Sequence, residues 1–136
     1  MKDYLFPAVY QNSAKSCGPT SLKIVAQFYG KDYPIEYLCD VCGMTEDGVS
    51  LYGLNKCAEK IGFQSQAIQC TIDDLQNQIP LPAIAFWNGC HFVVVYEMDE
   101  KYIGVSDPAK GLIKYSISEF AKGWCRDEKE GVLLVF

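Results

Sequence analysis

Residues 11–20 read QNSAKSCGPT and place Cys17 at the polar edge of an apolar run. Ser16 is a favoured N-cap residue, and Pro19 is tolerated in the first turn of a helix. Apolar residues then recur at helical spacing, at Leu22, Val25, Ala26 and Tyr29. The pattern predicts a helix that begins near Cys17 and ends at Gly30, with the thiol in its first turn.

A thiol in that position has the surroundings of a nucleophile. The pKa of a free cysteine is about 8.5, and a helix N-terminus or a nearby imidazolium lowers it. A catalytic thiol usually also needs a histidine as its base. The chain contains one histidine, His91, so it is the candidate. Acyl transfer further needs donors for an oxyanion, and the backbone N–H of Cys17 and the side-chain amide of Gln11 are two candidates.

A third residue follows from the hairpin that His91 opens. His91 begins the run HFVVVYE (91–97), and the facing run KYIGVSDP (101–108) contains Asp107 near its end. A loop centred on Asp99 would make His91 and Asp107 direct cross-strand partners, with Cβ atoms about 4.5–5.5 Å apart. An even-numbered turn would instead shift the register by one residue and send Asp107 to the other face. In the favourable register, Asp107 would orient the imidazole and stabilise its charged form.

The rest of the chain divides into helices and then strands. Further helices are predicted over 35–41, from Ser50 to Gly62 and from Thr71 to Gln78. Short runs of β-branched and aromatic residues predict strands over 82–87, 91–97, 102–106, 112–115 and 132–136, and 64–70 is a further candidate. Helices followed by an antiparallel sheet indicate an α+β fold with a cleft between its two halves.

Composition narrows the function classes. The 136 residues, 49% hydrophobic and 21% charged, predict one globular domain over 1–136. A net charge of −5 with no basic run argues against nucleic acid as a partner. The first residues have no signal-peptide pattern and no apolar run is long enough to cross a bilayer, so the chain looks cytosolic. Seven cysteines, an odd number, make a disulfide framework unexpected.

Taken together, these motifs resemble a known family. Gln-x5-Cys-Gly before a helix, then HFVVV and then SDP, are similar to the papain-like cysteine peptidases that process double-glycine leader peptides. The likeness extends to DGVSLYGLNKCAEKIGF (47–63), LPAIAFWN (81–88) and GVLLVF (131–136). In that family the domain usually forms the cytosolic N-terminus of a peptidase-containing ABC transporter, which cuts and exports bacteriocins or peptide pheromones.

The resemblance implies a role for each candidate residue. Cys17 becomes the nucleophile, His91 the general base and acid, Asp107 the orienting carboxylate and Gln11 the oxyanion donor. It also implies a papain-like fold, no cofactor, and as partners a leader peptide and the transmembrane and ATP-binding parts of a transporter, in the same or a separate chain. The implied location is the cytoplasmic side of the bacterial plasma membrane, as a soluble domain. Many members have Asp where this chain has Ser16, which should still cap the helix.

The resemblance further implies a narrow channel for two glycines and a groove for the rest of the leader. Trp87 and Asn88, just before His91, are candidates for the channel wall. Leu51 and Tyr52 of the helical half are candidates for the groove. Many members have His where Phe86 stands, and this difference changes the wall of the cleft.

Other hypotheses remain open on the sequence alone. The CDVC motif at 39–42 has the spacing of half a zinc site or of a redox motif, although two packing residues one helical turn apart explain it better. Cys90 competes with Cys17 as the nucleophile but lacks a helix terminus. A leader-binding module without activity and another Cys-His-Asp acyl-transferase are the alternative functions.

Overall fold

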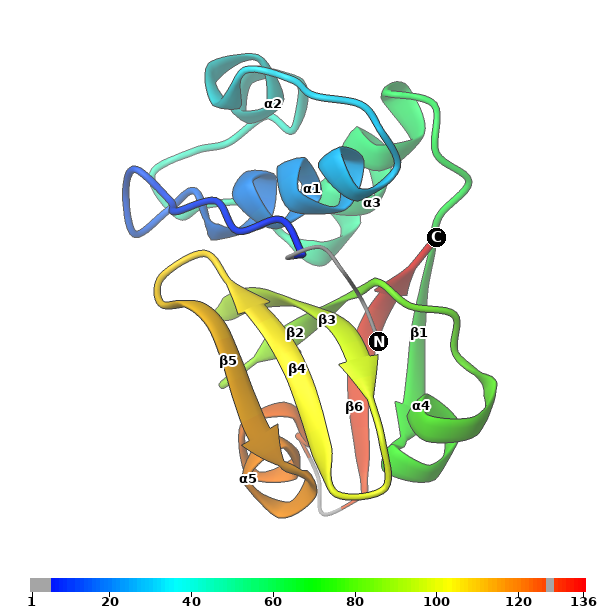
Figure 1. Cartoon of the computed structure of the whole chain (residues 1–136). Coiled ribbons are helices and arrows are strands. Elements are labelled where there is room, and N and C mark those ends of the chain that lie inside the picture. The colour runs from blue at the N-terminus through cyan, green and yellow to red at the C-terminus, as the bar shows by residue number, and fades with distance from the viewer. Residues whose placement is uncertain (1–5, 127–128) are drawn as a thin grey trace.

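The computed structural model describes residues 6–126 and 129–136. The helices are α1 (Cys17–Phe28), α2 (Ile35–Val41), α3 (Leu51–Lys60), α4 (Ile72–Gln78) and α5 (Ile117–Trp124). The strands are β1 (Gln66–Thr71), β2 (Ala83–Trp87), β3 (His91–Met98), β4 (Tyr102–Asp107), β5 (Gly111–Ser116) and β6 (Glu130–Val135). Figure 1 shows α1, α2 and α3 packed together on one side of the sheet. The predicted α+β fold is confirmed.

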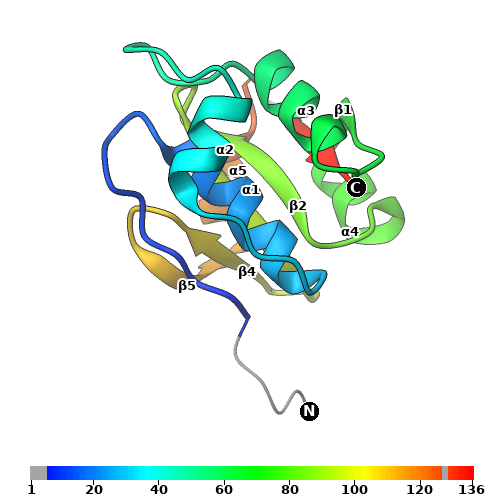
Figure 2. The same cartoon turned by 90° about the horizontal axis from the view of Figure 1, so that it is seen from above.

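The strands form one antiparallel sheet in the order β1-β6-β2-β3-β4-β5. The last strand, β6, lies between β1 and β2, where Leu134 pairs with Ile84. Seen from above in Figure 2, α1 lies across the sheet between β2 and β4, and it packs mainly on β3. This packing brings the start of α1 to the strands that carry His91 and Asp107.

The three predicted N-cap residues all precede a helix, and two of them cap it with their side chains. Ser50 accepts a hydrogen bond from the N–H of Gly53, and Thr71 forms a reciprocal capping box with Asp74. Ser16 occupies the N-cap position of α1, as predicted, but its side chain does not cap the helix. Ser16 has φ −98° and ψ 14° and makes no side-chain cap bond, because its hydroxyl donates to Asn12 Oδ1 at 2.9 Å instead.

The sequence analysis placed no helix between β5 and β6, and α5 corrects it. Ser116 and Glu119 form a capping box at the start of α5, so the S-x-x-E spacing was the signal. The helix is eight residues long and lies between two strands. Both α4 and α5 lie within the second half of the chain, which is therefore not purely a sheet.

The sheet is buried on both faces, and the side chains of β3 point alternately into two different cores. Phe92 and Val94 point into a core shared with α1, α2 and α3, whereas Val93 and Val95 point into a second core shared with α5. Side chains alternate along a strand, so a strand covered on both faces must be apolar at every position. This explains the unbroken apolar run after His91.

Within the described parts of the chain, none of the helices has both the length and the apolar character needed to span a membrane.

We predict that replacing Gly131 with alanine destabilises the fold through the second core. A β-carbon at Gly131 would lie 2.3 Å from Cδ2 of Trp124, whose side chain is fully buried and whose Nε1–H donates to the carbonyl of Val132. Overpacking of this kind costs about 1–3 kcal/mol of unfolding free energy. Urea denaturation followed by circular dichroism measures it.

Gly30→Asn is the matched control. Gly30 has φ +85° with no atom within 4 Å of an added β-carbon, and asparagine tolerates this backbone conformation. Equal stability of Gly131→Ala and the wild type would contradict the packing described for Trp124.

Candidate active site

Three side chains from three elements meet at the start of α1. Cys17 is the first residue of α1, His91 the first of β3 and Asp107 the last of β4. His91 Nε2 lies 2.8 Å from Asp107 Oδ1, and the Asp107 side chain is almost fully buried. The imidazole also interacts with the thiol of Cys17. The sequence therefore singled out residues that the fold does bring together.

The way His91 meets Asp107 differs from the expected direct pairing. Val94 pairs with Ser106 and Val95 with Val105, so Asp107 lies diagonally across from His91. The turn between the strands is even-numbered, because Asp99 N–H donates to the carbonyl of Tyr102. A regular ladder from such a turn would send Asp107 to the opposite face.

A β-bulge at Tyr96 changes the register so that Asp107 lies on the same face of the sheet as His91. Glu97 pairs with Gly104, whereas Val95 pairs with Val105, so Tyr96 is one extra residue on β3. The bulge returns Asp107 to the face of β3 that carries His91. Diagonal neighbours on one face are about 7–8 Å apart, a distance that an imidazole and a carboxylate can bridge.

The environment of Cys17 favours the thiolate. Burial raises the pKa of the Cys17 thiol, but the hydrogen bond to His91, the N–H groups of Phe92 and Gly18 and the charge of His91 together lower the pKa below its ordinary value. The positive end of the α1 dipole acts in the same direction. Because Ser16 does not cap α1, its hydroxyl does not occupy the first-turn N–H groups around Cys17.

The environments of His91 and Asp107 favour the charged forms. Burial lowers the pKa of His91, but its contacts with Asp107 and Cys17 outweigh this and raise the pKa to about 9. Burial raises the pKa of Asp107, while the hydrogen bonds from His91 and from the N–H of Ala109 lower it below its usual range. The site therefore favours a thiolate–imidazolium pair beside an ionised carboxylate.

Gln11 lies in the loop that leads into α1 and is held against the Asp107 turn. Its backbone N–H donates to the carbonyl of Pro108 at 2.8 Å. Its side-chain Nε2 donates to the carbonyl of Ser13 at 2.9 Å, which leaves one Nε2–H for another acceptor. The role of Gln11 as oxyanion donor stays a prediction.

A groove of about 870 Å³ borders the site. One wall is formed by the segment 42–53, which joins α2 to α3, and the other includes Phe86, Cys90 and Phe92 of β2 and the β2–β3 hairpin. Phe92 follows His91 and also lies against Gly18, the residue after Cys17, where an added β-carbon would be 3.4 Å from the Phe92 ring, so the groove reaches residues next to the Cys17–His91 pair. Cys17 and His91 themselves do not line it.

The four residues predicted to bind substrate lie in different places. Leu51 lines the groove, whereas its neighbour Tyr52 is 72% exposed and lies outside the groove lining. Trp87 is buried in the second core against Tyr115 and Phe120, directly across the strand pair from His91. Asn88 has φ 52° and forms the β2–β3 turn. Neither Trp87 nor Asn88 lines the groove.

The sequence analysis gave the loop before α3 no role, yet it forms much of the groove wall. Thr45 and Gly48 bond to each other through both backbone groups, at 3.1 and 3.0 Å. A β-carbon on Gly48 would lie 3.3 Å from the carbonyl oxygen of Lys15, so this loop packs against the loop that precedes Cys17. The only sequence signal was the turn residues Asp47 and Gly48.

The other cysteines include a buried pair, Cys42 and Cys57, whose thiols interact. Cys42 and Cys57 are buried in the first core, where the thiol of Cys57 donates to the carbonyl of Leu38 at 3.8 Å. Cys90 is exposed at the rim of the groove. Among residues 6–126 and 129–136, no three His, Cys, Asp or Glu side chains are placed to share a metal ion.

We predict that the reactivity of Cys17 depends on Asp107. In Asp107→Asn the pKa of His91 falls toward its ordinary value and the pKa of Cys17 rises, so less thiolate is present at pH 6. Iodoacetamide should then alkylate Cys17 about tenfold more slowly at pH 6, with the difference shrinking as the pH rises. Peptide mass spectrometry of the alkylated chain measures the rate at each cysteine.

Asp73→Asn, at an exposed aspartate on α4, is the control and should not change the rate. Faster labelling of Cys90 than of Cys17 in the wild type, or an unchanged rate in Asp107→Asn, would contradict this account of the site.

Comparison with known proteins identifies the family. The family model described as "Peptidase C39 family" matches residues 5–134. The chain is 37% identical over 131 residues to the lactococcin-G-processing and transport ATP-binding protein LagD of Lactococcus lactis subsp. lactis. The match covers 93% of this chain and 18% of that protein. The chain thus spans about a fifth of the length of this relative.

Solved structures agree with this result. A double glycine motif protease from an AMS/PCAT transporter, solved in complex with the leader peptide, has a TM-score of 0.89 and 32% identity, covering 96% of this chain and 89% of that one. The peptidase domain of Streptococcus ComA has a TM-score of 0.85 at 24% identity and covers 96% of each chain, which supports the papain-like fold. The chain belongs to the peptidase C39 family of cysteine peptidases.

Proposed function

We propose that this chain is the endopeptidase that removes a leader from a secreted precursor peptide by cutting after a Gly-Gly motif. The observation that carries the proposal is the joint placement of Cys17, His91 and Asp107, with pKa shifts that favour a thiolate and an imidazolium. Membership of the C39 family and the likeness to a double glycine motif protease support the choice of substrate.

In the acylation step, the thiolate of Cys17 adds to the carbonyl carbon of the second glycine. The negative charge moves to the carbonyl oxygen, where the N–H of Cys17 and the Nε2–H of Gln11 stabilise it. His91 then donates a proton to the leaving amine, the C–N bond breaks and a thioester remains on Cys17. This proton donation requires the imidazolium, so cleavage should fall as the pH rises through about 9.

In the deacylation step, the now neutral His91 removes a proton from water. The hydroxide adds to the thioester, the C–S bond breaks and the leader leaves with a free carboxylate. Asp107 holds the imidazole through Nε2 in both steps, so that the other nitrogen stays aimed at Cys17. No cofactor takes part in either step.

Two different parts of the substrate would contribute. Glycine has no Cβ, so a Gly-Gly segment can pass closer to the walls of a cleft than any other dipeptide. Glycine also buries little apolar surface, so affinity must come from the preceding residues of the leader. The groove beside Leu51 and Phe86 suits the apolar face of a leader helix.

The proposed partners extend beyond the precursor peptide. Because the chain matches a part of longer transport proteins, we propose that it works with transmembrane and ATP-binding parts of an ABC transporter, in the same or a separate chain. It would then act at the cytoplasmic side of the bacterial plasma membrane, as a soluble domain. The net charge of −5 disfavours nucleic acid as a partner.

We predict that cleavage depends on both the glycines and the length of the leader. A synthetic precursor with a full leader should be cut at least about tenfold faster, as kcat/KM, than one truncated to the last few residues before the cut. Replacing the second glycine with valine should reduce kcat/KM by about 100-fold, because misplacement of the scissile bond is costly. Cys17→Ala should cut none of the peptides. Equal rates for full and truncated leaders, or tolerance of valine, would count against the proposed substrate.

We also predict that Leu51 contributes to leader binding and that Tyr52 does not. Leu51→Asp should raise KM for the full leader at least about tenfold with little change in kcat, because burying a leucine is worth about 1.5–3 kcal/mol. Tyr52→Asp adds the same charge to the adjacent, exposed position and is the matched control. Similar effects of the two substitutions would show that the groove is not the leader site.

A further inference from the structure

The segment Phe6–Gln11, here called the strap, runs beside β4 before it reaches the loop of Cys17. Figure 2 shows this dark-blue segment passing beside β4 and β5 toward the start of α1. Ser106 Oγ donates to the carbonyl of Pro7 at 2.8 Å, and the N–H of Gln11 donates to the carbonyl of Pro108 at 2.8 Å. The strap is therefore fixed near both of its ends.

An aromatic stack adds a third attachment. The rings of Phe6 and Tyr96 are 4.4 Å apart and nearly parallel, with an interplanar angle of 11°. Tyr96 is the bulge residue, and its ring lies against Gly104, where an added β-carbon would be 3.0 Å from Cζ. The absence of a side chain at Gly104 thus leaves room for the ring that holds Phe6.

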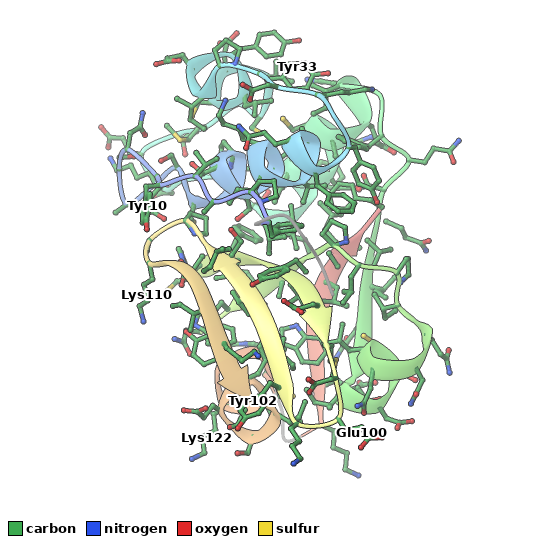
Figure 3. The ribbon with its side chains drawn as sticks, in the orientation of Figure 1. Tyr10, Tyr33, Glu100, Tyr102, Lys110 and Lys122 are labelled. Carbon is green, nitrogen blue, oxygen red and sulfur yellow. The ribbon has the colours of Figure 1, made fainter. Side chains whose placement is uncertain are left out.

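Tyr10 contributes a fourth contact, at the far end of the strap. Its hydroxyl oxygen would lie 2.5 Å from a β-carbon added at Gly111, so Tyr10 packs on the β4–β5 turn. Figure 3 shows the labelled Tyr10 near this turn, which also carries Lys110. Tyr10 precedes Gln11, so this contact also limits where the backbone of Gln11 can lie.

The side chain of Gln11 itself has few attachments. Nε2 donates to the carbonyl of Ser13, while Oε1 is buried without a hydrogen-bond partner among the described residues. The position of this amide therefore depends on where the strap holds the backbone. Oxyanion donors act only within a narrow range of distances, and a misplacement of about 1 Å can cost 100-fold in rate.

We propose that the strap sets the position of the Gln11 amide for the oxyanion, and that Ser106 and Tyr96 are its positioning residues. This inference rests on the proposed role of Gln11 as oxyanion donor. One face of β4 presents Asp107 to His91, and the other face, through Gly104 and Ser106, holds the segment that ends in Gln11. A single strand thereby aligns the base and the oxyanion donor.

The test compares two reactions of Cys17, both run on the full chain. With p-nitrophenyl acetate the thiolate adds to the ester carbonyl, forms an oxyanion and expels p-nitrophenolate, leaving an acetyl thioester. With iodoacetamide the thiolate displaces iodide from carbon and no oxyanion forms. Only the first reaction should depend on Gln11, and neither needs a leader peptide.

We expect Gln11→Ala to slow acylation about 100-fold. Ser106→Ala and, separately, Phe6→Leu, which removes the stack on Tyr96 without changing the bulge residue, should slow it about tenfold, which corresponds to one lost interaction. When either substitution is added to Gln11→Ala, the acylation rate should fall by less than about twofold further, because an absent amide cannot be misplaced. Iodoacetamide labelling and its pH profile should stay unchanged in all these variants. Ser118→Ala, at an exposed serine in α5, is the matched control for Ser106→Ala and should change neither reaction.

Three outcomes would overturn the proposal. The first is an equal loss from Ser106→Ala with and without Gln11. The second is slower iodoacetamide labelling in Ser106→Ala and Phe6→Leu, which would place their effect on the Cys17–His91 pair. The third is normal acylation in Gln11→Ala, which would remove the oxyanion role itself. The protein could show the expected dependence of the strap substitutions on Gln11 and still cut no double-glycine precursor. That result would support the positioning role of the strap and contradict only the proposed substrate.

Discussion

The pairing of β3 with β4 is the constraint on which the site depends. The two strands are joined by an even-numbered turn, which alone would send Asp107 away from His91. The bulge at Tyr96 shifts the register by one residue and brings the carboxylate within 2.8 Å of the imidazole. The Tyr96 side chain lies on the other face of β3, with Phe92 and Val94, where its ring stacks on Phe6. The bulge residue thus contacts the segment that leads to Gln11, while the register shift positions Asp107.

Electrostatic pairing then decides the protonation of the site. Each of the three groups is at least partly buried, and burial alone would disfavour the charged form of every one of them. The mutual contacts act in the opposite direction and prevail in each case. The three groups stabilise one another's charges: the imidazolium stabilises the thiolate, and the carboxylate stabilises the imidazolium. The helix terminus at Cys17 and the N–H of Ala109 at Asp107 extend this support at both ends.

The site and the groove are separate structures that share one hairpin. The groove is walled by the loop before α3 and by residues next to His91, while Cys17 and His91 do not line it. Under the proposed function, binding energy gained at Leu51 or Phe86 would hold a poorly binding glycine pair in place. The chain covers about a fifth of the length of the transport relative that it matches.

The sequence by itself determined the local features of this protein. It predicted the helix that begins beside Cys17, the caps at Ser50 and Thr71, the strands of the sheet and the set of Cys17, His91 and Asp107. These features depend on neighbouring residues and on spacing along the chain, so they can be read without a fold. It missed α5, whose eight residues lie between two strands, although the Ser116–Glu119 capping box was visible.

Only the tertiary structure decided the relations between elements. The sequence left two registers open for His91 and Asp107, and the choice depends on the bulge at Tyr96, which Gly104 and Phe6 accommodate from elsewhere in the chain. Ser16 could cap α1 by type, but contacts within its loop turned the hydroxyl to Asn12. Leu51 and Tyr52 are adjacent and both apolar, yet one lines the groove and the other faces solvent. For the register and for the groove, the deciding atoms belong to residues brought close by packing, and local sequence carries no record of that packing; for Ser16 the partner is close in sequence, but the shape of the loop decides which bond the hydroxyl makes.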